Sequence, residues 1–179
     1  MAFKNAISNK VEIAPELLLS SVHKNRGILW EKIATFQTQL SQVDNAIQHQ
    51  TKLMEEVFPT KHDFYNGLYT REILMPKDSL VVSYIHKQTH PSFFLSGEMS
   101  LVTDRGEIKR IKAPMSVMTE VGTQRVAYMH EDCVWVCVYR TDKKNIKEAE
   151  KEIYTTNYKD LPSHVILNKE LLCQDYIQQ

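Results

Sequence analysis

The sequence predicts a mainly β protein of the α+β class, in which one long helix precedes a barrel or sandwich of antiparallel strands. The first observation behind this prediction is the placement of chain-breaking residues. None of the six prolines falls within 16–58, whereas four of the five glycines follow residue 66. The second is the spacing of apolar residues, which is helical up to residue 57 and typical of short strands from residue 69 onward.

The charges of the 179-residue chain balance, with 22 Lys and Arg against 22 Asp and Glu. Such a balance excludes functions that need a broad electrostatic field, such as sequence-independent nucleic-acid binding or attraction to an anionic membrane. A hydrophobic fraction of 42% suits one globular domain with an appendage. No stretch has the apolar length of a membrane span or a signal peptide, so we expect a soluble protein that is not secreted.

Apolar residues recur at alternating spacings of four and three through the first part of the chain. This is a heptad pattern of about four repeats, and it predicts one continuous helix over residues 28–58, roughly 45 Å long at 1.5 Å per residue. The seam consists of Leu29, Ile33, Phe36, Leu40, Val43, Ile47, Gln50, Met54 and Val57. A stripe this narrow is typical of a coiled coil, so we expect these residues to join copies of the chain.

Two interpretations of this helix remain open from the sequence. In the first, the helix assembles a homo-oligomer, in which Gln50 pairs with its symmetry mates and fixes the register. The mixed aliphatic seam is compatible with a trimer. In the second, the helix packs on its own domain, because four heptads is close to the shortest pattern that indicates a coiled coil.

Short runs rich in Val, Ile, Tyr, Phe and Trp begin at Tyr69 and continue to Arg140, with turn signals every eight to ten residues. This pattern predicts seven or eight strands in an all-β unit. Beyond it, segment 145–153 predicts a short charged helix, and segment 164–167 predicts an extended run. The expected organisation is an N-terminal segment at 1–27, the heptad helix at 28–58, the β-barrel at 66–142, and a short helix with a C-terminal tail at 143–179.

Alternation along two of the strands assigns side chains to faces. One face of the first strand is expected to carry Leu80, Val82, Tyr84 and His86, so the last two would point the same way. One face of the second strand is expected to carry Cys133, Trp135, Cys137 and Tyr139, with three valines on the other face. A strand with two apolar faces is typically covered on both sides.

His86 and His90, in I-H-K-Q-T-H-P, are close enough in sequence to form a joint site. Two imidazoles can bind a first-row transition metal, but a stable site needs a third or fourth donor from elsewhere. We therefore expect no cofactor, and a divalent transition metal held by His86 and His90 is the alternative.

Five short motifs in the stranded part carry a resemblance to a known family. They are M-P-K-D-S-L, I-H-K-Q-T-H-P, F-L-S-G-E-M, I-K-A-P-M and E-V-G-T-Q-R, within residues 69–140. Together they resemble the cupins, which form a double-stranded β-helix or jelly-roll barrel. More narrowly, they are similar to cupin-like proteins encoded by tailed bacteriophages and prophages. The resemblance implies a cupin-like barrel behind the long helix, in a protein of the host cytoplasm or an assembled virion.

Metal-binding cupins resemble one another in a first motif with two histidines and a glutamate, and a second motif that supplies another histidine. Aligning the motifs puts Tyr84 and His86 at the two histidine positions and His90 at the glutamate. Arg125 takes the place of the second-motif histidine, and a guanidinium cannot bind a cation. The phage-type relatives usually end the last strand with a histidine, where this sequence has Tyr139.

This ligand set implies a pocket of Tyr84, His86, His90, Arg125 and Tyr139 rather than an intact metal centre. If Arg125 faces the barrel interior, its charge needs a partner, either Glu98 or Glu120 or an anionic ligand. No nucleophile or phosphate-loop motif accompanies the pocket.

Three functions follow from these observations. The first is a non-catalytic homo-oligomeric protein, a phage structural or accessory component that binds itself and other virion proteins. The second is a metal-dependent cupin enzyme of the dioxygenase or isomerase kind. The third is a barrel that sequesters a small anionic ligand through Arg125.

Overall fold

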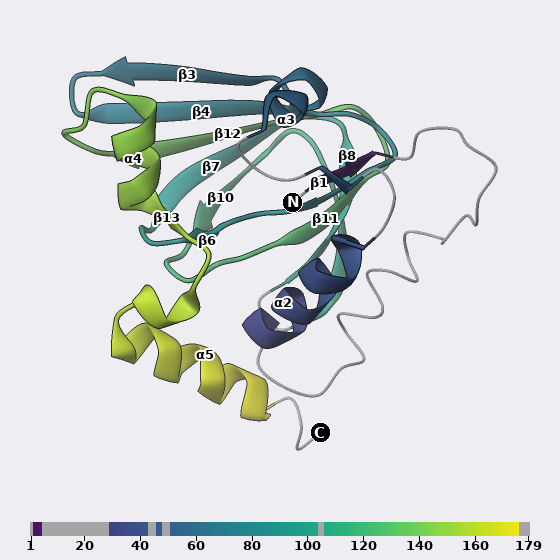
Figure 1. Ribbon diagram of the computed structural model, residues 1–179, viewed down its shortest axis with the longest axis vertical. Helices are drawn as coiled ribbons and strands as arrows, with labels where there is room; N and C mark the ends of the chain where they lie inside the picture. Colours follow the sequence, from purple (N-terminus) through teal and green to yellow (C-terminus); the bar gives the residue numbers. More distant parts are fainter. Residues whose placement is uncertain (1, 5–28, 43–45, 48–50, 104–105, 176–179) are drawn as a thin grey trace.

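The computed structural model of the protein describes residues 2–4, 29–42, 46–47, 51–103 and 106–175. In this part of the chain two antiparallel sheets face each other (Figure 1). The six-stranded sheet has the order β2 (Ala46–Ile47), β1 (Ala2–Lys4), β5 (Ser79–Val82), β11 (Val126–Met129), β8 (Glu98–Val102), β9 (Ile108–Lys112). The prediction of a mainly β fold with antiparallel sheets is confirmed.

The five-stranded sheet has the order β10 (Met115–Thr119), β7 (His90–Ser96), β12 (Cys133–Arg140), β4 (Leu68–Met75), β3 (Thr60–Tyr65). A small sheet pairs β6 (Ile85–His86) with β13 (Tyr154–Thr155). Because β3 begins at Thr60, the sheet starts before residue 66, where the sequence pattern places the barrel. Two opposed antiparallel sheets are consistent with the jelly-roll architecture that the sequence predicts.

The inner faces of both sheets form the main hydrophobic core. β12 shows the expected alternation, because Cys133, Trp135, Cys137 and Tyr139 are buried while the valines between them are only half-buried. Residues from the six-stranded sheet, including Met99 and Met129, complete this core from the opposite side. The core therefore lies between the sheets, where the strand period of two places every second side chain.

Helix α2 (Leu29–Leu40) packs on the outer face of the six-stranded sheet (Figure 1). Ile33, Phe36 and Leu40 are 0–3% exposed. They form one cluster with residues of β5, β8 and β11, namely Leu80, Val82, Val102 and Val126. The six-stranded sheet is thus covered on both faces, by the opposite sheet inside and by α2 outside.

The prediction of one continuous helix over residues 28–58 is wrong. The helix that starts at Leu29 ends at Leu40, Ile47 lies in strand β2, and a separate helix, α3, spans Lys52–Val57. Thr51 begins α3 as an N-cap, because its hydroxyl accepts a hydrogen bond from the backbone N–H of Met54.

The seam residues bury themselves within the protein's own fold. Ile47 and Met54 belong to the core between the sheets, and Val57 packs against it. Val43 and Gln50 lie outside the described residues. The seam residues that are buried in this way are not exposed for a second copy, which favours the interpretation that the helix packs on its own domain.

The segment after β12 folds back onto the barrel. Helix α4 (Ile146–Ile153) appears where the charged segment 145–153 predicts one, capped by Asn145, whose side chain accepts a hydrogen bond from the N–H of Glu148. A short 3-10 helix, η1 (Tyr158–Asp160), follows, and then helix α5 (Ser163–Asp175). The extended run predicted at 164–167 is therefore wrong.

Trp30, at the start of α2, joins these C-terminal elements to the barrel. Its indole Nε1 donates a hydrogen bond to the carbonyl of Gly122 at 2.9 Å, and its ring stacks on Tyr158 with centroids 5.1 Å apart. Leu161 and Val165 belong to the same cluster. Val165, Ile166 and Leu167 form a short continuous apolar run, which is compatible with a strand as well as a helix, and this explains the wrong prediction.

Two turns of the barrel depend on glycine. Asn66 and Gly67 connect β3 to β4 with φ values of 50° and 83°, as in the two-residue hairpin turns that Asn-Gly favours. Gly97 connects β7 to β8 with φ of 95°. A Cβ atom at Gly97 would lie 2.5 Å from the carbonyl oxygen of Asp132, whereas a Cβ at Gly67 would meet nothing within 4 Å.

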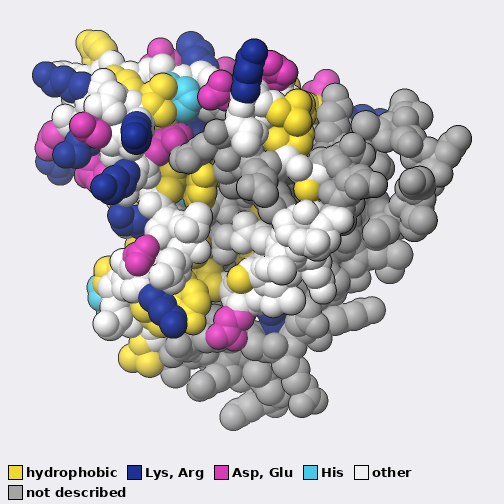
Figure 2. All heavy atoms as spheres, in the orientation of Figure 1, with side chains coloured by type: hydrophobic (Ala, Val, Ile, Leu, Met, Phe, Trp, Pro, Cys, Tyr) yellow, Lys and Arg dark blue, Asp and Glu magenta, His cyan; other side chains and the backbone are white. Residues whose placement is uncertain are grey.

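The surface agrees with the balanced composition. Figure 2 shows Lys and Arg interspersed with Asp and Glu over the region of β3, β4 and α4. Among the described helices, none is long and apolar enough to cross a membrane.

Candidate functional site

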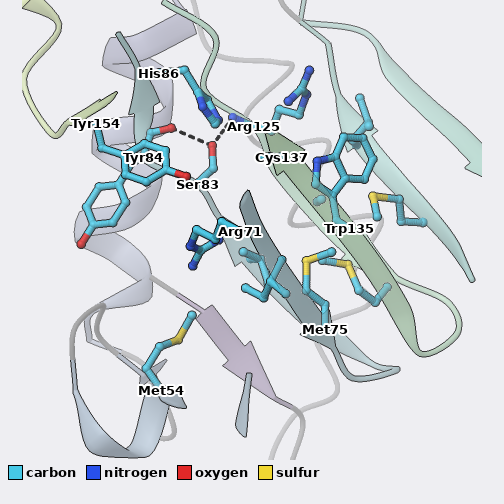
Figure 3. Close-up of a pocket in the computed structure, with 16 residues that line it drawn as sticks. Met54, Arg71, Met75, Ser83, Tyr84, His86, Arg125, Trp135, Cys137 and Tyr154 are labelled. Atoms are coloured by element: carbon cyan, nitrogen blue, oxygen red, sulfur yellow. Dashed lines mark hydrogen bonds between the residues drawn. The ribbon is translucent and has the colours of Figure 1, made fainter. Parts of the chain in front are cut away.

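A cavity of about 110 Å³ lies between the two sheets. Its wall is largely apolar, but it also contains two arginines, Arg71 on β4 and Arg125 directly before β11 (Figure 3). The lining residues are Met54, Arg71, Ile73, Met75, Val81, Ser83, Tyr84, His86, Met99, Leu101, Arg125, Ala127, Met129, Trp135, Cys137 and Tyr154. Strands of the two sheets thus bring two arginines to one cavity.

The residues predicted for the pocket fall into two groups. Tyr84, His86 and Arg125 line the cavity. His90 and Tyr139 are buried beside His86, with ring centroids 4.8 Å and 6.3 Å from that of His86. The structure therefore brings all five residues together, three of them at the cavity wall and two in the layer of side chains next to it.

The predicted common face of Leu80, Val82, Tyr84 and His86 is wrong for its first two members. Leu80 and Val82 point outward to α2, and Val81 and Ser83 line the cavity instead. β5 ends at Val82, and the irregular backbone at residues 83–84 breaks the alternation. Ser83 and Tyr84 both line the cavity at this break, and β6, which starts at Ile85, then brings His86 to the same wall.

Arg125 faces inward, as its alignment with a cupin ligand position implies. Its guanidinium lies 5.7 Å from the centre of the Trp135 ring and donates a hydrogen bond from Nη2 to Thr119 Oγ1 at 3.2 Å. Its backbone N–H donates to Ser83 Oγ at 2.9 Å (Figure 3). These contacts hold the Arg125 backbone at Ser83, directly after β5, and its guanidinium against an aromatic ring.

The carboxylates considered as partners of Arg125 have other contacts. Glu98 forms ion pairs with Arg110 and Lys112. Glu120 accepts a hydrogen bond from Thr89 Oγ1 at 2.9 Å.

Arg71 is a cavity residue that the sequence analysis missed. Together with Tyr69, Ile73 and Met75 it lies on the inner face of β4, where every second residue points inward. This spacing of two was the signal available in the sequence. Its Nε lies 3.7 Å from Glu150 Oε1 on α4, an ion-pair distance but too long for a hydrogen bond. The buried Nε–H has no hydrogen-bond partner among the described residues.

A chain of hydrogen bonds runs from the cavity wall into the core. The hydroxyl of Tyr139 lies 3.1 Å from His86 Nδ1 and 2.8 Å from the hydroxyl of Tyr154. The Nδ1–H of His90 donates to the carbonyl of Gln88 at 2.9 Å, and its buried Nε2 has no hydrogen-bond partner among the described residues. Tyr154, also absent from the predicted site, enters through its pairing with His86 in the small sheet.

Burial keeps these groups uncharged. Burial, reinforced by His90, Arg125 and Arg71, lowers the pKa of His86 well below its ordinary value. Burial also lowers the pKa of His90, although the hydrogen bond to Gln88 opposes this. The pKa of the Tyr139 phenol is raised well above its ordinary value, chiefly by burial. At neutral pH the positive charge of the cavity therefore resides on its arginines and not on its imidazoles.

The lowered histidine pKa values predict that stability falls in mild acid. In the unfolded chain an imidazole has a pKa near 6.5, so below that pH the unfolded state binds more protons than the folded state. The free energy of unfolding is therefore highest above about pH 6.5 with respect to these histidines. It falls as the pH drops towards the folded-state pKa, by up to roughly 1.4 kcal/mol per pH unit for each such histidine. Urea unfolding at pH 7 and pH 5 measures this loss.

His86→Gln is expected to reduce this pH dependence, because it removes one of the buried imidazoles. His164→Gln, at an exposed position on α5, is the matched control and should keep the wild-type dependence. Equal pH dependence in His86→Gln and wild type would contradict the attribution of this stability loss to His86.

The residues at the barrel centre do not fit a resident metal ion. His86 and His90 supply two imidazoles, and the neighbouring Tyr139 is a neutral phenol, which is a poor ligand. Among the described residues, no group of three or more His, Cys, Asp or Glu side chains is arranged to hold a metal. Nearby Arg71 and Arg125 add positive charge where a cation would sit. This donor set suits an anion better than a cation.

A larger hollow of about 650 Å³ lies beside the cavity, against α4 and β13. Tyr84 and Tyr154 line both spaces, and their rings stack with centroids 5.5 Å apart. Lys147 and Lys151 of α4 line the outer hollow but not the inner cavity. The tyrosine pair therefore forms a wall between the inner cavity and a hollow that bears lysines.

No protein-family model and no curated protein sequence matches this chain. Solved structures that are similar in shape include the Cupin_2 domain of an XRE-family transcriptional regulator from Enterobacter cloacae, with 14% identity and a TM-score of 0.40 over 49% of this chain and 99% of that one. Ectoine synthase from P. lautus has 12% identity and a TM-score of 0.45 over 64% and 82% of the two chains. Acetylacetone dioxygenase from Acinetobacter johnsonii has 11% identity and a TM-score of 0.39 over 55% and 78%. Similarities this distant assign no activity to this chain.

Proposed function

We propose that this protein is a non-catalytic binding protein with a cupin-like barrel that captures a small anionic ligand. The observation that carries this proposal is the convergence of Arg71 and Arg125, from opposite sides of the barrel, on one largely apolar cavity. Guanidinium groups in such surroundings bind carboxylates and phosphates through charge-assisted hydrogen bonds.

Other features support binding over catalysis by a metal. The donor set around His86 lacks a third ligand of the usual kinds among the described residues. No observation on the described residues therefore favours the metal-dependent enzyme that the sequence leaves open. Self-association rests on the heptad seam, and a place in a virion and a phage origin rest on the sequence resemblance; all three stay predictions.

Isothermal titration with acetate, benzoate and inorganic phosphate tests the proposal. We expect the wild-type protein to bind at least one of these anions, and Arg125→Gln to weaken that binding about tenfold or more, because a hydrogen bond to a charged group contributes about 1.5–3 kcal/mol. Arg110→Gln is the matched control, since Arg110 is exposed and pairs with Glu98 away from the cavity. Absence of binding by all three anions, or equal binding by Arg125→Gln, would refute the proposal.

A further inference from the structure

The inner face of the five-stranded sheet changes from polar to apolar along the barrel. On β4 the inward residues follow the order Arg71, Ile73, Met75. Their partners on β12 are Cys137, Trp135 and Cys133. At about 3.3 Å per residue, the step from Arg71 to Met75 spans roughly 13 Å. This wall therefore has a charged end and an end made of sulfur-containing apolar side chains.

The six-stranded sheet repeats the same order on the opposite wall. Arg125 is followed by the inward residues Ala127 and Met129. Across the ladders, Ala127 pairs with Val81 and Leu101, and Met129 pairs with Met99. Ser83 lies beside Arg125, and the backbone N–H of Ser83 donates a hydrogen bond to the Arg125 carbonyl at 2.9 Å. Figure 3 shows Ser83, His86 and Arg125 together, with Met75 on the far side.

The apolar part of the cavity suits a flexible hydrocarbon group. Four methionines line it, Met54, Met75, Met99 and Met129, and unbranched thioether side chains adapt to irregular shapes. The middle is lined by Trp135 and by the aliphatic side chains of Ile73, Val81 and Leu101, which form no hydrogen bonds. A volume of about 110 Å³ restricts the occupant to a small molecule.

We infer that the ligand is a small carboxylate with an apolar tail, whose head lies at Arg71 and Arg125 and whose tail extends along Ala127 and Trp135 towards the methionines. The inference rests on the proposed function and adds the chemical class of the ligand. A planar carboxylate matches a guanidinium fork. A dianionic phosphate would bring more charge into a wall that offers it few hydrogen bonds.

Isothermal titration of the wild-type protein with acetate, butanoate and hexanoate tests the inference. Each methylene that leaves water is expected to raise the affinity about fourfold. Hexanoate should therefore bind on the order of a hundredfold more tightly than acetate. Hexan-1-ol, which has the tail without the charge, should bind at least about tenfold more weakly than hexanoate.

Ala127→Leu is expected to flatten this series, because the larger side chain occupies the middle of the cavity. Val136→Leu, on the outward face of β12, is the matched control and should keep the wild-type series. The titrations with acetate, butanoate and hexanoate use the wild-type protein, so they test the inference even if Ala127→Leu folds poorly.

Equal affinities for acetate, butanoate and hexanoate would overturn the inference while leaving the proposed anion-binding function in place. Equal affinities for hexanoate and hexan-1-ol would overturn it as well, since the arginines would then contribute nothing. Failure of acetate, benzoate and phosphate alike to bind would refute the proposed function, and the inference, which rests on it, would fall with it.

Discussion

Phe36→Ala is expected to lower the free energy of unfolding by about 3 to 5 kcal/mol, the usual cost of removing a fully packed aromatic ring. Phe36 is 3% exposed and lies in the cluster that joins α2 to the outer face of the six-stranded sheet. The loss combines the transfer free energy of the ring with the cavity that remains. Urea unfolding of the purified variant measures it, and light scattering on the same sample gives the oligomeric state.

Thr35→Ala is the matched control, because Thr35 is exposed on the same helix. It should change stability by less than about 0.5 kcal/mol. If Phe36→Ala kept wild-type stability and instead dissociated an oligomer, the coiled-coil interpretation of the heptad seam would be restored.

Gly97→Ala is expected to destabilise the fold by about 2 to 5 kcal/mol, from the left-handed backbone and the overpacking together. The new Cβ would lie 2.5 Å from the Asp132 carbonyl oxygen and 2.7 Å from Cys133 Sγ. Neither atom can move freely, since the first belongs to the backbone and the second is buried. Thermal and chemical unfolding both measure the loss.

Gly67→Ala separates the two causes of this loss. Gly67 has a similar positive φ, but a Cβ there meets nothing within 4 Å. Its substitution should cost only the conformational part, roughly 1 to 2 kcal/mol. Equal losses at the two positions would show that the contact at Gly97 does not matter.

The heptad seam illustrates where sequence patterns stop being informative. Spacings of four and three identify which residues are buried, and Ile33, Phe36 and Leu40 are indeed buried on one side of α2. They do not identify what covers those residues, because a neighbouring sheet and a second helix bury an apolar stripe equally well. The pattern also continues through Ile47, which lies in a strand, since one correctly spaced residue is compatible with either structure.

The candidate site was predictable where residues belong to recognisable motifs. Tyr84, His86 and Arg125 were named from the cupin resemblance, and all three line the cavity. Arg71 was not named, because a charged residue within an apolar strand reads as solvent-facing until the strand's register is known. Tyr154 follows helix α4 in a segment with no motif, and only the pairing with β6 brings it to the site.

The pairing of β13 with β6 has a consequence for how this protein can be shortened. Tyr154, which lines the cavity beside Tyr84, and Glu150, which pairs with Arg71, come from the chain that follows the last barrel strand. A truncation after residue 142, at the edge of the strand pattern, would keep the two large sheets but remove Tyr154 from the cavity wall and Glu150 from Arg71. Recombinant fragments intended for ligand screening should therefore extend at least through Thr155.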